Sequence, residues 1–372
     1  MSRARTFADL ATASEEGNLA TANIVINGDM AIWQRGTTSI TASGPNYFCD
    51  RFATDHGQGG ATTSQLTLSG SDTPYTLGFR YGLRMTNTSN TTATNGYRQL
   101  RYRAEAQDIA NSGWNYTDPN SFITLSFWVK SSLAGTYYCT LEPDDQSDKY
   151  AYNIGFTLLA DTWTKVTHAV PGHSTLVFNN DNGIGMSIHW RIWLGTNYTT
   201  SGTGTSSWYD TDSSSTLSPD FLQNWANTSS ATFDLTGFQM ELGEVATPFK
   251  HESYGDNLQR CQRYFYKYIS NNDYGPLGAN GMQINTNSSS GVMYQGQHPI
   301  TMRAAPTMAY GGSWNAEVAT GNGSFSLAGS VRSSDLFWQS QEAIGDGGAN
   351  GYAAIVYASG DDDAFLSGDA EL

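Results

Sequence analysis

Large apolar side chains recur at every second position over roughly the first two thirds of this chain. In residues 185–194 (GMSIHWRIWL), they alternate with Ser187, His189 and Arg191 on the opposite side. Residues 122–130 (FITLSFWVK) carry bulky side chains on both faces, as is typical of a central strand. Because the strand-like segments follow one another without helical patterns between them, the sequence predicts an all-β fold, an antiparallel jelly-roll β-sandwich.

The hydrophobic period changes once, near residue 253. Residues 253–268 place Leu258, Cys261 and Tyr268 on one stripe of a short helix, which either Ser253 or Asp256 can cap. Beyond this helix, short strand patterns return with few large aliphatic side chains and many glycines. A core this thin is commonly completed by neighbouring copies in a symmetric oligomer.

These patterns divide the chain into three parts. Residues 1–20 are polar and too few to bury a core, so we expect either a terminal peptide that docks onto another protein or a disordered tail. Residues 21–252 are expected to form the jelly roll. Residues 253–372 are expected to form the short helix and a smaller C-terminal β domain, which joins subunits or forms a tip.

Composition and charge narrow the partners. Charged residues make up only 14% of the 372 residues. Aromatic residues make up 13%, and they can bury more apolar surface than a solvated, disordered chain would carry. The formal charge of −15 argues against nucleic acid, because phosphate binding needs clustered Lys and Arg. Insertion into a membrane is not expected either, since no apolar run approaches the ~20 residues that span a bilayer.

The familiar catalytic motifs are missing from the sequence. The six histidines form no HExxH pair, the three cysteines form no CxxC pair, and neither G-x-S-x-G nor G-x-G-x-x-G occurs. Acidic neighbours such as Glu142 with Asp144 and Asp145 do occur, and a glycosidase needs two carboxyl groups facing each other across a cleft. The sequence cannot pair them, so we expect a non-enzymatic protein, with a polysaccharide hydrolase as the alternative.

Aromatic residues in polar, loop-like surroundings are the candidates for carbohydrate binding. Their rings can stack on the apolar faces of sugars, or they can pack against the rims of the sandwich instead. The candidates are Trp114, Tyr116, Trp208, Tyr209 and Trp225.

A calcium ion is the one cofactor that the sequence suggests. Calcium prefers carboxylate and carbonyl oxygens, and it often braces the rim of jelly-roll carbohydrate modules. Asp29 follows the Asn-Gly turn at the start of the jelly roll, and Asp234 lies in its last strand. Both are candidate ligands, with ordinary turn and surface roles as the alternative.

An ordered set of motifs runs along most of the chain. It starts with NIVINGDMAIWQRGT (residues 23–37) and YFCDRFATD (47–55), and it continues through FITLSFWVKSS, TWTKVTHAVPG and GFQMELGEVATPF to YGDNLQRCQRYFYK and PITMRAAPTM. In this order, the motifs resemble those of a family of bacteriophage tail fibre and minor structural proteins, in which Trp is commoner at the position of Phe52. YGDNLQRCQRYFYK matches the terminal helix of that family's domain, and PITMRAAPTM resembles the start of its C-terminal β domain.

The resemblance implies a virion component with a carbohydrate-module-like jelly roll, commonly trimeric, which attaches the phage to its host. On this reading, the protein is made in the host cytoplasm and built into the particle, at the tail. Its residues 1–20 contact other virion proteins, and its ligand is a bacterial surface polysaccharide. Subunit contacts are expected at Gln262, Tyr264 and Tyr266. A head-attached fibre or capsid decoration protein and a tailspike-type hydrolase are the alternatives. The family has no catalytic signature, so no catalytic residue follows from it.

Overall fold

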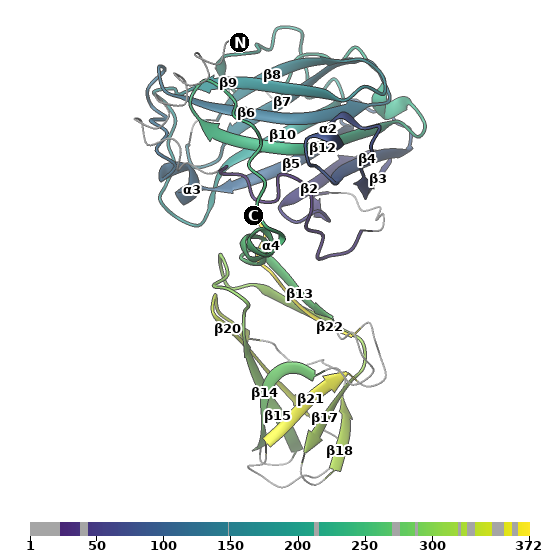
Figure 1. Cartoon of the computed structure of the whole chain (residues 1–372), viewed down its shortest axis with the longest axis vertical. Helices are drawn as coiled ribbons and strands as arrows, with labels where there is room; N and C mark the ends of the chain where they lie inside the picture. The colour runs from purple at the N-terminus through teal and green to yellow at the C-terminus, as the bar shows by residue number, and fades with distance from the viewer. Residues whose placement is uncertain are drawn as a thin grey trace. The chain divides into compact units, whose positions relative to one another are not determined.

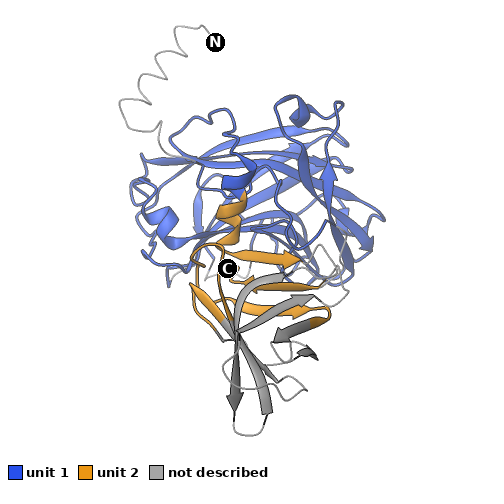
Figure 2. Cartoon of the chain, turned by 60° about the horizontal axis from the view of Figure 1, so that its bottom comes forward, with its two compact units in different colours: residues 1–257, 372 blue, residues 258–371 orange. Residues whose placement is uncertain are grey.

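The structure is a computed structural model of the chain. It describes the backbone of residues 23–37, 44–147, 149–211, 216–269, 276–286, 289–318, 321–325, 332–343, 353–358 and 364–372, and in several C-terminal strands the backbone alone. The expected docking peptide, residues 1–20, lies outside this described part. Two compact units are present, residues 1–257 with 372 and residues 258–371 (Figure 2).

Unit 1 is a sandwich of two antiparallel sheets, most of whose strands are labelled in Figure 1. The seven-stranded sheet has the order β1 (Asn46–Tyr47), β2 (Phe52–Gly57), β5 (Tyr97–Glu105), β10 (Ile184–Leu194), β7 (Gly135–Pro143), β8 (Tyr150–Leu158) and β11 (Trp208–Asp210). The five-stranded sheet has the order β3 (Gly60–Thr67), β4 (Tyr81–Ser89), β12 (Thr232–Leu242), β6 (Phe122–Ser131) and β9 (Thr164–Pro171). The all-β sandwich predicted from the hydrophobic pattern is confirmed.

Within the described residues of unit 1, the helices that accompany these strands are short: α2 (Thr73–Thr76), α3 (Ala106–Ala110) and the 3-10 turn η1 (Trp225–Asn227). No helix in the described part of the chain has both the length and the apolar character needed to cross a membrane.

Aromatic rings from both sheets fill the space between them. Trp190 of β10 packs edge-on against Phe238 of β12 at 4.7 Å and against Phe127 of β6 at 5.7 Å between ring centroids. All three side chains are fully buried. Because such rings bury large areas and prefer edge-to-face contacts, this cluster locks the two sheets together. It also fixes which face of each strand points inward.

The Asn-Gly motif at the start of the jelly roll has a structural role. Asn27 adopts a positive φ of 60°, and its side-chain amide donates to the carbonyl oxygens of Ile32 at 3.0 Å and Asp50 at 2.9 Å. A β-carbon on Gly28 would lie 2.0 Å from the carbonyl oxygen of Phe238, so only glycine fits beside β12. This segment closes the sandwich against its last strand.

Unit 2 begins within α4 (Tyr254–Gln262), the short helix that the sequence predicts. Ser253 caps this helix, because its Oγ accepts a hydrogen bond from the backbone N–H of Asp256 at 3.2 Å. A three-stranded sheet follows, in the order β13 (Phe265–Ile269), β22 (Phe365–Asp369) and β16 (Thr307–Gly311). A second sheet has the order β18 (Gly321–Phe325), β17 (Trp314–Val318), β21 (Ala353–Ala358), β14 (Pro276–Thr286), β15 (Ser289–Gln297), β20 (Phe337–Ala343) and β19 (Arg332–Ser333).

Two of the three expected subunit-contact residues lie inside unit 2 instead. Tyr264 and Tyr266 are fully buried, and the Tyr266 hydroxyl lies 2.9 Å from Nδ1 of His298. Burial raises the pKa of Tyr266 well above its ordinary value. Their prediction as surface contacts is wrong, because both rings are needed for the unit's own small core. Gln262 is half-buried at the end of α4.

Candidate functional site

The outer surface of the seven-stranded sheet carries a continuous set of polar side chains. Strand register places His189 of β10 opposite Arg101 of β5 and opposite Thr140 of β7, and Thr140 lies opposite Asn153 of β8. These residues alternate with the core residues of the same strands, so they lie on the face directed away from the core. We call this surface the polar face; it comprises Asp55, Gln99, Arg101, Arg103, Thr140, Glu142, Asn153, Ser187, His189 and Arg191.

Apart from half-buried Arg103 and Glu142, the side chains of the polar face are almost as buried as those of the core. Arg191 is 3% exposed, Asp55 and His189 are 7% exposed, and Arg101 is 8% exposed. Buried polar groups of this kind destabilise a fold unless hydrogen bonds or ion pairs compensate them. Side chains on an ordinary, solvated sheet surface need no such compensation, because water hydrates them. The polar face therefore differs from an ordinary sheet surface.

Arg191 organises the centre of the polar face. Its Nη1 donates to Oε1 of Gln99 at 2.6 Å, its Nε donates to Oγ1 of Thr140 at 3.3 Å, and its Nη2 forms an ion pair with Glu142. The second carboxylate oxygen of Glu142 lies 3.2 Å from Nε2 of His189. Burial by itself raises the pKa of Glu142, but the charge of Arg191 and the contact with His189 outweigh burial and hold this pKa well below its ordinary value.

His189 is neutral near neutral pH. Burial lowers its pKa and the charges of Arg191 and Arg101 lower it further, although Glu142 opposes them. A neutral imidazole carries one proton, and the carboxylate beside Nε2 favours the proton there. The other ring nitrogen, Nδ1, is then a hydrogen-bond acceptor.

The network extends from Thr140 to β11 at the edge of the sheet. Oγ1 of Thr140 donates to Oδ1 of Asn153 at 2.7 Å, and Nδ2 of Asn153 donates to the Tyr209 hydroxyl at 2.9 Å. That hydroxyl donates to the carbonyl oxygen of Leu217 at 2.9 Å, and burial raises the pKa of Tyr209 to about 12. Tyr209, a predicted carbohydrate-binding residue, therefore lies beside the polar face and is bound to it.

Three buried atoms of the polar face have no hydrogen-bond partner. They are Nε of Arg101, Oδ1 of Asp55 and Nδ1 of His189. Leaving such an atom unsatisfied costs about 1–3 kcal/mol, so folding alone does not account for them. Similar atoms occur elsewhere in the described residues, such as Nε of Arg98 and Nε1 of Trp190, but these three lie on adjacent strands of one face, as the groups of a ligand site do.

Two predicted carbohydrate-binding residues belong to the core instead. Trp225 is fully buried, with its indole N–H donating to the carbonyl oxygen of Thr232 at 3.2 Å. Trp114 is 3% exposed, and its indole N–H donates to Ser121 at 3.2 Å. The polar residues around them in the sequence suggested exposed loops, but both rings belong to the hydrophobic core of the sandwich. Their prediction as stacking platforms is wrong.

Tyr116 and Trp208 are half-buried against the same core. The Tyr116 ring packs edge-on against Phe178 at 4.9 Å. Trp208 packs against Tyr152 at 5.3 Å, and its indole N–H donates to the carbonyl oxygen of Pro171 at 2.8 Å. The sequence patterns that singled out these aromatic residues thus identify one residue beside the polar face, Tyr209.

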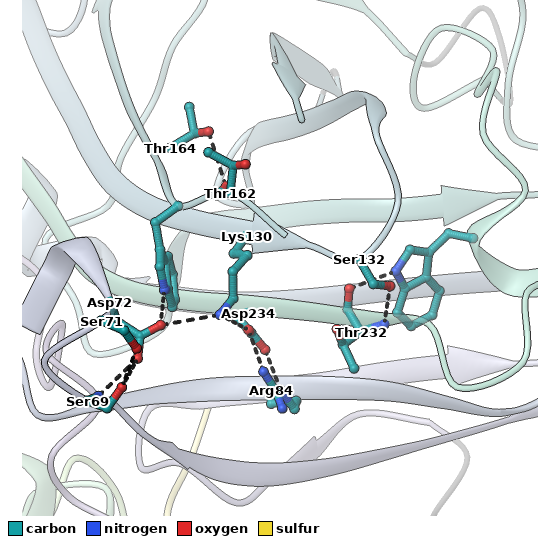
Figure 3. Close-up of polar contacts among 12 residues, drawn as sticks. Ser69, Ser71, Asp72, Arg84, Lys130, Ser132, Thr162, Thr164, Thr232 and Asp234 are labelled. Carbon is teal, nitrogen blue, oxygen red and sulfur yellow. Dashed lines mark hydrogen bonds and ion pairs between the residues drawn. The ribbon is translucent and has the colours of Figure 1, made fainter. Parts of the chain in front are cut away.

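The outer surface of the five-stranded sheet carries a second polar cluster, which we call the ion-pair face (Figure 3). Asp234, fully buried in β12, accepts from Nε and Nη2 of Arg84 at 2.7 and 2.8 Å and lies 3.5 Å from Nζ of Lys130. Lys130 also lies 3.4 Å from Asp72, which accepts from the Trp163 indole N–H at 2.7 Å. The cluster therefore alternates positive and negative groups.

The structure does not support the predicted calcium site. Two cationic side chains occupy the oxygens of Asp234 and would repel a metal ion. Asp29 accepts a hydrogen bond from the Asn257 amide at 3.1 Å, and burial raises its pKa, which disfavours the charged form that calcium needs. Within the described residues, no group of three or more His, Cys, Asp or Glu side chains could hold a metal ion.

The sequence pattern predicts one strand of the polar face, residues 185–194, but not the face as a whole. The alternation of Ser187, His189 and Arg191 was plain, whereas Arg101 and Asp55 were not singled out. A usable signal exists in YRQLRYR (residues 97–103), where polar side chains alternate with bulky ones at the same period. Only the pairing of β5 with β10 shows that the two polar rows adjoin.

No family model matches the chain, and no curated protein matches it. Among solved structures, it is similar to the enzymatically active domain of tailspike protein 4 of bacteriophage CBA120, with a TM-score of 0.29, 9% identity and coverage of 59% of this chain. It spans about a fifth of that tailspike chain, 21%.

Two carbohydrate-associated structures are similar over comparable lengths. The family 11 carbohydrate-binding module of Clostridium thermocellum Lic26A-Cel5E gives a TM-score of 0.26 with 15% identity, covering 57% of this chain and 99% of the module. A putative sugar binding protein from Bacteroides thetaiotaomicron gives 0.28 with 9% identity, covering 59% and 100%. At TM-scores this low, the similarities carry no information about the ligand of this protein.

Proposed function

We propose that this protein is a non-enzymatic structural component of a bacteriophage particle, a tail fibre that attaches to a glycan on the host surface. In this proposal, the jelly roll of unit 1 binds the glycan through the polar face. Residues 1–20 contact other virion proteins, and three copies of the chain assemble. Multivalency then raises the avidity of weak individual sites.

The observation that carries the glycan proposal is the set of unsatisfied buried atoms on the polar face. Nε of Arg101 is a donor, whereas Oδ1 of Asp55 and neutral Nδ1 of His189 are acceptors. Sugar hydroxyls both donate and accept hydrogen bonds, so one sugar unit can satisfy both kinds of group. The Tyr209 ring beside the face adds the flat apolar surface on which sugars stack.

The virion part of the proposal is supported by the ordered motifs that resemble phage structural proteins. In this structure, those motifs form the closing segment, the inner strands and α4, with Asn27 and Gly28 at a demanding turn. Motifs that shape the fold in this way are shared through a common architecture. They leave the outer surface free to vary with the host.

The state of Glu142 argues against this carboxyl group as the general acid of a glycosidase. A glycosidase needs a general acid that is protonated near neutral pH. The pKa of Glu142 is held well below its ordinary value by Arg191 and His189, so this carboxyl group stays ionised. Asp55 shares the face and accepts from the Gln99 amide at 3.1 Å.

Binding of the full chain to an array of bacterial surface polysaccharides tests the proposal. Asp55→Asn keeps the shape of the side chain but replaces one acceptor oxygen with a donor, and we expect about 10-fold weaker binding. Glu244→Gln is the matched control, because Glu244 is exposed and leaves the polar face untouched. Circular dichroism verifies that both variants fold. Equal binding by both variants would show that the polar face does not bind the glycan.

Three further measurements separate the alternatives. Release of reducing sugar from a bound polysaccharide would indicate the hydrolase. Antibody labelling at the capsid rather than at the tail would indicate a head fibre or decoration protein. Sedimentation equilibrium should give about three times the 40.4 kDa of one chain, and a mass near that of a single chain would overturn the trimer.

A further inference from the structure

Arg101 is a charged side chain that the fold buries without a hydrogen bond or ion pair to any described residue. It lies in the middle of β5, opposite Ala53 of β2 and opposite His189 of β10. It is 8% exposed, its Nε is fully buried without a partner, and it makes no hydrogen bond or ion pair with any described residue. Its two Nη atoms are likewise unbonded but are not among the fully buried atoms, so they face solvent.

The neighbouring arginines of the same sheet are all engaged. Arg191 is bound to Gln99, Thr140 and Glu142, and Nε of Arg103 donates to Oγ of Ser187 at 3.3 Å. Taking part of a guanidinium out of water without a direct partner is unfavourable. Arg101 therefore differs from Arg191 and Arg103 in making no direct hydrogen bond or ion pair, although the charge of Asp144 acts on it at longer range.

The acceptors beside Arg101 define the rest of the ligand. Nδ1 of neutral His189 and Oδ1 of Asp55 are both unsatisfied and have almost no exposed surface, so each accepts a hydrogen bond from a hydroxyl where a ligand displaces the side chains that cover it. His189 lies directly opposite Arg101, and Asp55 lies opposite Gln99, two residues before it in β5. A molecule with one acidic group and adjacent hydroxyls is complementary to all three side chains.

We infer that the polar face binds a glycan containing an acidic sugar, whose carboxylate pairs with the guanidinium of Arg101 while neighbouring hydroxyls bind His189 and Asp55. This inference rests on the proposed glycan-binding function and adds the chemical class of the ligand. The planar guanidinium matches a carboxylate through two parallel hydrogen bonds.

A carboxylate fits this face better than a phosphate monoester. A phosphate monoester carries close to two negative charges at neutral pH, whereas the face offers one uncommitted cation. Arg191 is already neutralised by Glu142, and the whole chain carries a formal charge of −15. A singly charged group is therefore the anion whose charge the site balances.

The test uses uronic-acid-containing capsular polysaccharides, each paired with its carboxyl-reduced neutral form, and a glycerol phosphate polymer as the phosphate probe. Binding of the full chain is compared with that of Arg101→Gln. Lys165→Gln is the control, because Lys165 is exposed on β9 of the other sheet and its loss changes the net charge equally. We expect wild type to prefer the acidic forms and Arg101→Gln to bind them about 10- to 100-fold more weakly. Lys165→Gln should bind like wild type.

Each outcome decides the inference. Equal affinity of wild type for acidic and reduced forms overturns the inference and leaves the glycan proposal intact, whereas binding to no glycan overturns the proposal itself. Preference for the phosphate polymer overturns the carboxylate assignment. If circular dichroism shows that Arg101→Gln is misfolded, Arg101→Lys and the ratio of acidic to reduced binding by wild type decide, since that ratio needs no variant.

Discussion

The two outer faces of the sandwich use similar residues in opposite ways. On the ion-pair face, Arg84 and Lys130 surround Asp234 and every one of these charges has a partner. On the polar face, Arg191 and Glu142 form a comparable pair, yet Arg101 beside them has none. Both sets lie on strands whose inner faces form one core.

The contrast distinguishes charges that stabilise the fold from a charge that is available to bind a ligand. A satisfied network contributes to stability, and removing one member leaves the others unpaired. A buried charge without a partner is unfavourable for folding, so its presence indicates a function outside folding. Four predictions test whether the faces differ in this way, from the largest expected effect to the smallest.

Glu142→Gln should cause the largest loss of stability. The substitution leaves the 3%-exposed Arg191 without a counter-ion, and we expect the free energy of unfolding to fall by about 3 kcal/mol. Urea denaturation followed by tryptophan fluorescence measures it. Glu244→Gln, at an exposed position, is the control and should leave the urea midpoint unchanged.

Asp234→Asn should destabilise the ion-pair face less, by about 1–2 kcal/mol in the same assay. The side chains of Arg84 and Lys130 are 31% and 17% exposed, so water can rehydrate them when the carboxylate is neutralised. Glycan binding should not change. A loss of binding in this variant would show that the ligand binds the ion-pair face and not the polar face.

Stability should fall on acidification below pH ~6.5 through His189. Its pKa is lowered by burial in the folded state, so the unfolded chain binds a proton first and protonation favours unfolding. His189→Asn should reduce the slope of unfolding free energy against pH by up to about 1.4 kcal/mol per pH unit. Half-buried His168 and buried His298, whose pKa values are also lowered, keep part of the slope. An unchanged slope in His189→Asn would show that His189 is protonated in the folded protein.

Arg101→Gln should have the smallest effect on folding, within about 0.5 kcal/mol in urea denaturation, or a slight gain. Arg101 has no protein partner to lose, and the substitution removes a buried charge. A loss above about 2 kcal/mol would show that Arg101 stabilises the fold and would abolish the distinction between the two faces.

Much of the fold was predictable from the sequence, and little of the site. Polar loop composition suggested that Trp114 and Trp225 are exposed, but tertiary packing covers both rings. Tyr264 and Tyr266, which lie near the predicted helix, were expected to contribute to subunit contacts. In the structure, a small unit with few aliphatic residues uses these tyrosines as its own core.

The sequence by itself determined that residues 185–194 form a strand with one apolar and one polar side, because alternate side chains of a strand point to opposite faces. It also determined the turn at Asn27 and Gly28. Only the tertiary structure decided that Asp55, Arg101 and His189 adjoin. Their strands β2, β5 and β10 are neighbours in the sheet but far apart in the chain. The period of a strand fixes the face of each side chain, whereas strand order and register fix its neighbours.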